Sequence, residues 1–140
     1  MPLPIAQTAS RSVDCIDRIS QAACRVLVVD DNEDAADSLA LLVNLWGHRA
    51  RVAYDGPGAF QLAREYQPEA VFLDLNLPGL SGYEVARRLR TEPALEKTLL
   101  VAMTRHGPVN QERTYEAGFD LYLTKPLVVG VLQELLARRN

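Results

Sequence analysis

Two adjacent aspartates, Asp30 and Asp31, follow directly on the apolar run VLVV at residues 26–29. Two more acids come soon after in the stretch VLVVDDNED, and no lysine or arginine lies among them. Two carboxylates about 4 Å apart repel each other by roughly 4 kcal/mol at an effective dielectric constant near 20. We therefore expect a positive charge from outside this stretch to stabilise it.

Three further polar residues stand at the ends of apolar runs: Asp74 after AVFL, Thr104 after TLLVAM and Lys125 after LYLT. Three carboxylates that meet in one crevice need a cation, and an all-oxygen site of this kind suits Mg²⁺. A carboxylate beside an open coordination position can attack phosphorus, which makes Asp74 a candidate for an aspartyl phosphate. The Lys125 ammonium and the Thr104 hydroxyl would neutralise the phosphoryl oxygens during transfer.

The apolar pattern predicts that strands and helices alternate along the chain, an arrangement that would bring these side chains to one edge of a sheet. Strands are expected at 25–29, 48–53, 70–75, 98–104 and 121–124, and helices at about 34–46, 57–66, 81–91, 110–117 and 127–139. Gly47 is suited to end the first of these helices, and Ser81 with Glu84 has the spacing of a capping box. The pattern indicates an α/β fold with a doubly wound, five-stranded parallel sheet, whose site lies at the carboxyl ends of the strands.

The length and charge of the chain narrow the possible partners. The 140 residues, 48% of them hydrophobic, suit one domain with a single core. The net charge of −3 gives no electrostatic reason to expect direct nucleic acid binding. The sequence has no signal-peptide pattern and no apolar run of roughly 20 residues, so we expect a cytoplasmic protein that does not bind a membrane. Residues 1–24 are predicted to be a tail or linker with a short helix around 13–23, and residues 25–140 to form the domain.

Four stretches in order, VLVVDDNED, VFLDLNLPGLSGYE, VAMT and GFDLYLTKP, resemble the receiver domain of bacterial two-component response regulators. The resemblance runs from about residue 25 to residue 138. It implies a flavodoxin-like fold with strand order 2-1-3-4-5. It also implies that Asp74 takes a phosphoryl group from a sensor histidine kinase or a histidine phosphotransfer protein. Asp31, Asp74 and the backbone carbonyl of Asn76 would ligate Mg²⁺, and Asp30 would act mostly through a metal-bound water.

The same resemblance implies a conformational switch rather than an enzyme. Thr104 and Tyr122 would form the switch pair, and Lys125 would bind the phosphate beside a cis peptide before Pro126. Phosphorylation would remodel the face formed by the fourth helix, the fifth strand and the fifth helix, and this face would bind an output protein. Arg105 departs from the small residue that is usual after the switch threonine, so we expect it to modulate access to Asp74.

Simpler interpretations of these residues stay open at this point. Asp30 and Asp31 could cap the following helix, Thr104 could be a strand-end hydroxyl, and Arg105 could point to solvent. For the whole chain, the alternatives are the receiver module of a hybrid histidine kinase, a haloacid dehalogenase-type phosphatase, or a module that binds partners without phosphorylation. The phosphatase would need a second acid two residues after the nucleophile, where this chain has Asn76.

Overall fold

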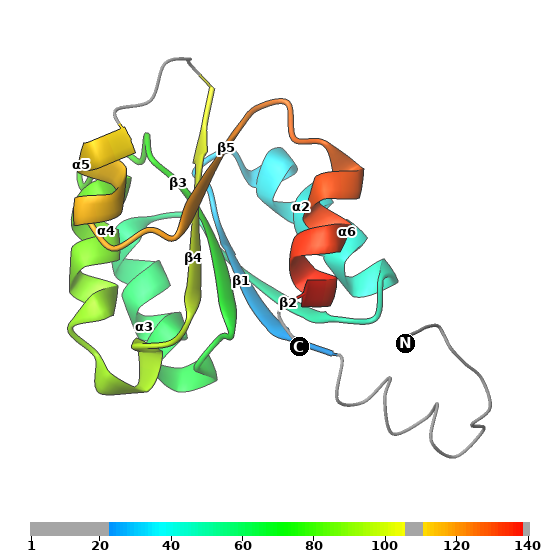
Figure 1. Cartoon of the computed structure of the whole chain (residues 1–140), viewed down its shortest axis with the longest axis horizontal. Helices are drawn as coiled ribbons and strands as arrows, with labels where there is room; N and C mark the ends of the chain where they lie inside the picture. The colour runs from blue at the N-terminus through cyan, green and yellow to red at the C-terminus, as the bar shows by residue number, and fades with distance from the viewer. Residues whose placement is uncertain (1–22, 106–110, 139–140) are drawn as a thin grey trace.

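The computed structural model describes residues 23–105 and 111–138, and it contains the predicted parallel sheet. The strands are β1 (Arg25–Val29), β2 (Arg49–Ala53), β3 (Ala70–Asp74), β4 (Leu99–Thr104) and β5 (Leu121–Thr124). They pair in the order β2-β1-β3-β4-β5, and every pair is parallel. All strands therefore end at the same edge of the sheet, the upper edge in Figure 1.

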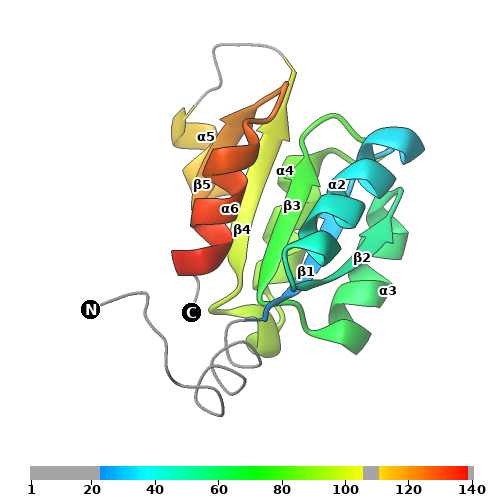
Figure 2. The same ribbon diagram turned by 90° about the vertical axis from the view of Figure 1, so that its right-hand side faces the viewer.

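Helices cover both faces of this sheet. They are α2 (Glu33–Leu45), α3 (Gly56–Tyr66), α4 (Gly82–Arg90), the short 3-10 helix η1 (Pro93–Leu95), α5 (Gln111–Glu116) and α6 (Val129–Arg138). Figure 1 shows α3, α4 and α5 on one face, and Figure 2 looks onto α2 and α6, which cover the other. The central strands β1 and β3 are covered by helices on both faces. They therefore contain continuous runs of apolar residues instead of alternating apolar and polar ones.

Two apolar clusters, one on each face, hold the layers together. Leu73 and Leu89 belong to the cluster under α3 and α4. Phe72 and Leu136 belong to the cluster under α2 and α6. Neighbouring residues of β3 thus bury their side chains on opposite faces, so a change at either position affects only one layer of helices.

The element bounds agree with the prediction within two residues over the described chain. The largest difference is at α6, which begins at Val129 instead of Leu127. The carbonyl of Val128 accepts hydrogen bonds from the amides of Val131 and Leu132, so helical bonding starts at this carbonyl and Val129 is the first helical residue. Leu127 instead packs against the core under α2 and α6. The predicted helix around residues 13–23 falls almost wholly outside the described residues.

Local signals explain where the helices start and stop. Asn32 caps α2 by accepting a hydrogen bond from the amide of Ala35, and Gly47 follows the helix with a φ of 95°. Ser81 caps α4, because its hydroxyl accepts a hydrogen bond from the amide of Glu84 at 3.3 Å. Among the described helices, none combines the length and the apolar character that crossing a membrane requires.

Candidate functional site

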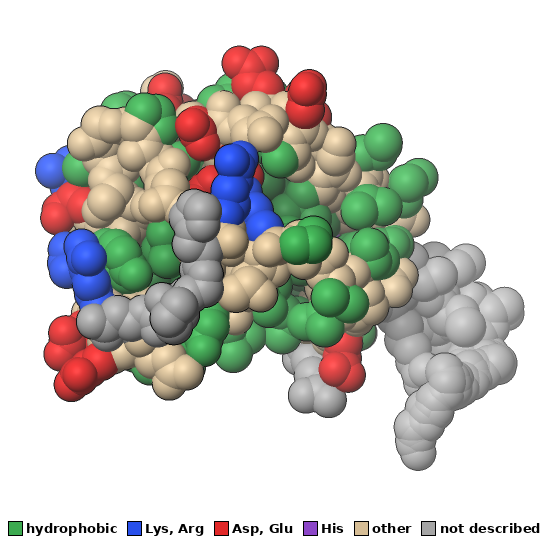
Figure 3. Space-filling view, turned by 90° about the horizontal axis from the view of Figure 1, so that it is seen from above, with side chains coloured by type: hydrophobic (Ala, Val, Ile, Leu, Met, Phe, Trp, Pro, Cys, Tyr) green, Lys and Arg blue, Asp and Glu red, His purple; other side chains and the backbone are tan. Residues whose placement is uncertain are grey.

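The carboxyl ends of the strands bring the predicted acids together at one edge of the sheet. Asp30 follows β1 and Asp74 ends β3, and both side chains are buried, each with a relative exposure of 2%. Asp31 is exposed beside them. Carboxylate oxygens of these three aspartates all lie within 4.8 Å of one another. Seen from above, acidic and basic side chains lie side by side over the middle of this edge (Figure 3).

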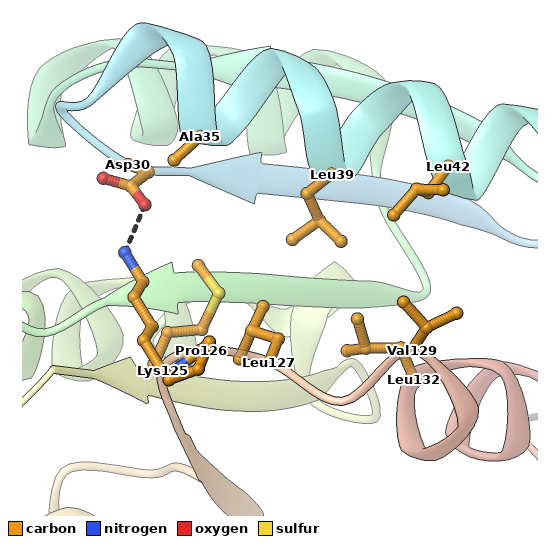
Figure 4. Close-up of a pocket in the computed structure, with 10 residues that line it drawn as sticks. Asp30, Ala35, Leu39, Leu42, Lys125, Pro126, Leu127, Val129 and Leu132 are labelled. Atoms are coloured by element: carbon orange, nitrogen blue, oxygen red, sulfur yellow. Dashed lines mark hydrogen bonds and ion pairs between the residues drawn. The ribbon is translucent and has the colours of Figure 1, made fainter.

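Lys125 supplies positive charge to the two buried acids. Its Nζ donates to Oδ2 of Asp30 at 2.6 Å and to Oδ2 of Asp74 at 3.3 Å. Figure 4 shows the first of these contacts at the end of the space between α2 and α6. Lys125 reaches this position from the end of β5, and its peptide bond to Pro126 is cis, as the resemblance implies. A lysine that bridges two buried carboxylates offsets part of the repulsion expected from the sequence.

Backbone amides hold the other carboxylate oxygens. The amide of Asn32 donates to Oδ1 of Asp30 at 3.0 Å, and the amide of Asn76 donates to Oδ1 of Asp74 at 2.8 Å. In each of these local turns, the aspartate carboxylate accepts a hydrogen bond from the backbone amide of the residue two positions later in the sequence. The capping interpretation of Asp30 and Asp31 is wrong for α2, because Asn32 forms the cap.

The two buried acids have shifted pKa values of opposite direction. Burial by itself would raise the pKa of Asp30, but the hydrogen bonds from Lys125 and the Asn32 amide outweigh it, and the pKa lies below its usual value. Burial raises the pKa of Asp74, and the nearby Asp30 charge adds to this, against the lowering by the Asn76 amide and Lys125. The Lys125 ammonium therefore stabilises the charge of Asp30 more than that of Asp74.

The donor set at this edge fits a hard cation. Mg²⁺ binds oxygen ligands at 2.0–2.1 Å in an octahedron, which puts neighbouring ligand oxygens about 2.9 Å apart and opposite ones about 4.1 Å apart. The three carboxylates come within 4.8 Å of one another, so they need only small movements or an intervening water to share one ion. Asp31, Asp74 and Asn76 also line one open pocket of about 230 Å³, which leaves room for the ion and its waters.

Arg105 lines this same pocket, which we call the open pocket. It is the first residue after β4, and its side chain is exposed. A second pocket, of about 250 Å³, lies between α2 and α6 and is lined mostly by apolar residues, with Asp30 and Lys125 at its end (Figure 4). Among the described residues, the site therefore has Lys125 on the side of α2 and α6 and Arg105 on the side of the open pocket.

The predicted switch residues lie on the neighbouring strands β4 and β5. The side chain of Thr104 is buried, and its carbonyl accepts a hydrogen bond from the amide of Lys125 at 2.7 Å. Tyr122 is half-buried, and its hydroxyl accepts a hydrogen bond from Nε2 of Gln111 at 2.8 Å. Gln111 begins α5, so this bond joins Tyr122 to the helix on the predicted output face. The sequence pattern did not single out Gln111, because nothing in its spacing indicates a contact with β5.

Gly82 is a second residue that the sequence pattern left without a role. It begins α4, and its amide donates to the carbonyl of Leu75 at 3.0 Å. A Cβ atom at this position would lie 2.5 Å from the carbonyl oxygen of Asp74 and 2.6 Å from Cα of Leu75. Only glycine therefore lets α4 begin so close to the end of β3. The glycine is present in the LSGYE stretch of the sequence, but its close contact with the end of β3 becomes apparent only in the folded structure.

Comparisons with known proteins agree with this geometry. Residues 26–137 match the family model of the response regulator receiver domain. The sensory transduction protein RegX3 of Mycolicibacterium smegmatis is 37% identical over 113 residues, which are 81% of this chain and 47% of that protein. The DNA-binding dual master transcriptional regulator RpaA of Synechocystis is 32% identical over 115 residues, or 46% of its length. The chain thus spans about half the length of the curated relatives it matches.

A solved structure shows the same fold with a metal. The receiver domain of the sensor histidine kinase PA1611 from Pseudomonas aeruginosa has a magnesium ion coordinated in its active site cleft. It is 27% identical to this chain with a TM-score of 0.75, and the likeness covers 83% of this chain and 96% of that one.

Proposed function

Because this chain belongs to the response regulator receiver domain family, we propose that Asp74 accepts a phosphoryl group from a phosphohistidine. The donor would be a sensor histidine kinase or a histidine phosphotransfer protein. The observation that carries the proposal is the position of Asp74: it is buried at the end of β3, contacts Lys125 and opens onto the pocket that it shares with Asp31 and Asn76.

The residues around Asp74 suit an in-line transfer. A carboxylate oxygen of Asp74 forms the bond to phosphorus, the bond from phosphorus to the histidine nitrogen breaks, and its electron pair returns to the imidazole. A magnesium ion held by Asp31, Asp74, the Asn76 carbonyl and, through water, Asp30 would neutralise charge on the phosphoryl oxygens. Lys125 would move part of its interaction from Asp30 to the new phosphoryl group, since it already lies 3.3 Å from Asp74.

Phosphorylation would then shift the position of the switch residues. A phosphoryl group adds about −1.5 to −2 charges, which attract the Lys125 ammonium and the Thr104 hydroxyl. Movement of Thr104 would leave space into which Tyr122 turns, and the bond from Gln111 to Tyr122 would break. The altered face consists of α5, β5 and α6, and output would pass through it to a protein partner. A change of population from 1:99 to 99:1 requires about 5.5 kcal/mol of differential stabilisation.

The proposal extends to the setting of the domain. We propose a signalling domain rather than an enzyme, located in the cytoplasm, with residues 1–24 as a tail or linker before it. RpaA is named as a DNA-binding regulator, but the similarity covers 46% of it, so we assign protein contacts, and not DNA contacts, to the receiver fold itself. A receiver module within a hybrid histidine kinase is the alternative setting, and the likeness to the receiver domain of the sensor histidine kinase PA1611 supports keeping it. The family match removes the haloacid dehalogenase alternative.

Acetyl phosphate labelling tests the proposed function. We expect the wild-type protein to gain one base-labile, hydroxylamine-sensitive phosphoryl group in the presence of Mg²⁺, and none after chelation. Asp74→Asn should abolish the label, because the amide is not a nucleophile towards phosphorus. Intact-protein mass spectrometry measures the outcome.

Asp37→Asn is the matched control, since Asp37 is an aspartate on α2 whose side chain accepts a hydrogen bond from Tyr54. It should label as the wild type does. Equal labelling of Asp74→Asn and wild type, or labelling that ignores the chelator, would show that the assignment is wrong. A wild-type protein that binds Mg²⁺ and takes no label would favour a module that binds partners without phosphorylation.

A further inference from the structure

Arg105 is the cation on the solvent side of the candidate site. It shares the open pocket with Asp31, Asp74 and Asn76, which are the other lining residues within the described part of the chain. Lys125 does not line this pocket; it approaches Asp74 from the side of α2 and α6. A group attached to Asp74 that extends into the open pocket would therefore meet Arg105 on a side that Lys125 does not cover.

The guanidinium of Arg105 is available for such a group. Within residues 23–105 and 111–138, no ion pair or hydrogen bond joins it to another side chain, although Asp31 and Asp74 line the same pocket. Two other arginines of the described surface do form ion pairs: Arg64 pairs with Glu92, and Arg90 pairs with Asp120. Arg105 thus shares a pocket with Asp31 and Asp74 without forming an ion pair with either, and a phosphoryl group on Asp74 that extends into this pocket would come near it.

We propose that Arg105 binds the phosphoryl group carried by Asp74 and prolongs its lifetime; this inference rests on the proposed function. Guanidinium presents a planar fork of donors that matches two phosphoryl oxygens, and it keeps its charge at any physiological pH. Binding brings a cation to a group that carries about −1.5 to −2 charges. It also places the side chain across the open pocket, through which water must reach phosphorus.

Loss of the phosphoryl group is hydrolysis of the acyl phosphate. A water oxygen forms the bond to phosphorus, the bond to the Asp74 oxygen breaks with its electron pair returning to the carboxylate, and a proton passes to solvent with the inorganic phosphate. Attack must come opposite the leaving oxygen, from the pocket side. Arg105 is held across this approach only when phosphoryl oxygens are present to bind it. It should therefore slow dephosphorylation of Asp74 more than it slows phosphorylation.

Two substitutions distinguish the effect of the Arg105 charge from the effect of a side chain that blocks the open pocket. Arg105→Met keeps most of the length of the side chain and removes the charge and the donors, whereas Arg105→Lys keeps the charge and loses the fork. Each protein is labelled with acetyl phosphate and Mg²⁺, freed of donor by gel filtration, and followed by mass spectrometry at fixed Mg²⁺ and ionic strength. We expect Arg105→Met to lose its label roughly three- to tenfold faster than wild type, and Arg105→Lys to lie between them.

Arg64→Met is the matched control, because Arg64 is an exposed arginine whose partner is Glu92 and not a residue of the site. It should lose its label at the wild-type rate. Raising the salt concentration to about 1 M shortens the Debye length to about 3 Å, so it should speed loss from wild type and leave Arg105→Met nearly unchanged.

The possible results divide cleanly. Equal lifetimes of wild type and Arg105→Met, with Asp74 labelled in both, overturn the inference alone. A wild-type protein that never labels on Asp74 overturns the proposed function, and this inference with it.

Discussion

Single residues at the acidic edge differ in what balances their charge. Asp30 and Asp74 are buried and share the ammonium of Lys125, at 2.6 Å and 3.3 Å. Asp31 is exposed, and Lys125 makes no ion pair with it among the described residues. The charge of Asp31 therefore adds little to the stability of the metal-free protein, whereas its carboxylate would be a ligand for a bound metal ion. A substitution at Asp31 can therefore show the effect of carboxylate repulsion on stability separately from the effect on metal binding.

Asp31→Asn should raise the melting temperature of the metal-free protein and weaken its binding of Mg²⁺. Removing one like charge beside Asp30 and Asp74 is expected to stabilise the apo fold by roughly 0.5–1 kcal/mol, since Asp31 is exposed and its interactions are screened by solvent. Thermal unfolding in chelator and a Mg²⁺ titration measure the two effects. A variant that melts lower than wild type and still binds Mg²⁺ normally would indicate that Asp31 acts through the dipole of α2 instead.

Asp34→Asn is the control for this experiment. Asp34 lies in the first turn of α2, where a negative charge suits the helix dipole. Its substitution should lower the melting temperature slightly and leave Mg²⁺ binding unchanged, in contrast to the change at Asp31.

Elements position the site through close backbone contacts as well as through side chains. The start of α4 lies against the end of β3, where the amide of Gly82 donates to the carbonyl of Leu75. This contact fixes the loop that follows Asp74, and the amide of Asn76 in that loop orients the Asp74 carboxylate. The position of the proposed nucleophile thus depends on a helix that contributes no side chain to the pocket.

Gly82→Ala should destabilise the fold and slow labelling of Asp74. The added Cβ would come within 2.5 Å of the Asp74 carbonyl oxygen and 2.6 Å of Leu75 Cα, and both atoms are backbone. Such overpacking costs about 1–3 kcal/mol and would displace the end of β3. Urea unfolding and the initial rate of labelling by acetyl phosphate measure the change.

Gly130→Ala provides the comparison, because Gly130 lies in α6 and no described atom beyond its chain neighbours and the backbone of its own helix lies within 4 Å of a Cβ built there. Alanine in a helix is favoured over glycine by about 1 kcal/mol, so this variant should be neutral or more stable. Similar results for the two substitutions would show that the close approach at Gly82 has no consequence.

At the scale of the whole molecule, a contact of His48 within the described part of the chain makes stability depend on pH near neutrality. Nδ1 of His48, just after α2, accepts a hydrogen bond from the amide of Cys24 at 3.0 Å, which requires that nitrogen to be unprotonated. Burial lowers the pKa of His48 from its usual value of 6.5, partly opposed by the charge of Glu69. The folded state thus binds this proton less readily than the unfolded chain does.

The free energy of unfolding should therefore fall as the pH drops through the unfolded value near 6.5 and level off below the lower pKa of the folded state. Above that range, the contribution of His48 is constant. In His48→Gln, the side-chain oxygen can still accept the hydrogen bond from the Cys24 amide. We expect the melting temperature of this variant to fall less than that of wild type when the pH is lowered from about 7.5 to about 5.5. Parallel curves for the two proteins would exclude His48 as the cause.

The sequence by itself determined the strands, the helices and the edge at which the polar residues gather. Apolar runs such as VLVV and AVFL specify buried strands, and alternation with amphipathic segments leaves few ways to arrange them. Asp30, Asp74 and Lys125 each follow such a run, so their meeting at one edge was predictable from local patterns. The start of the last helix was placed two residues too early, because apolar residues such as Leu127 do not distinguish a helix from a loop packed on the core.

Only the tertiary structure decided which groups touch. Lys125 lies 95 residues from Asp30 and 51 from Asp74 along the chain, and its choice of partners depends on how the crossovers set the strands side by side. The contact of Gln111 with Tyr122 and the close approach of Gly82 to β3 likewise depend on the packing of helices against strands. Local pattern carries no information about such distances, because they are fixed by the packing of elements that are remote in sequence.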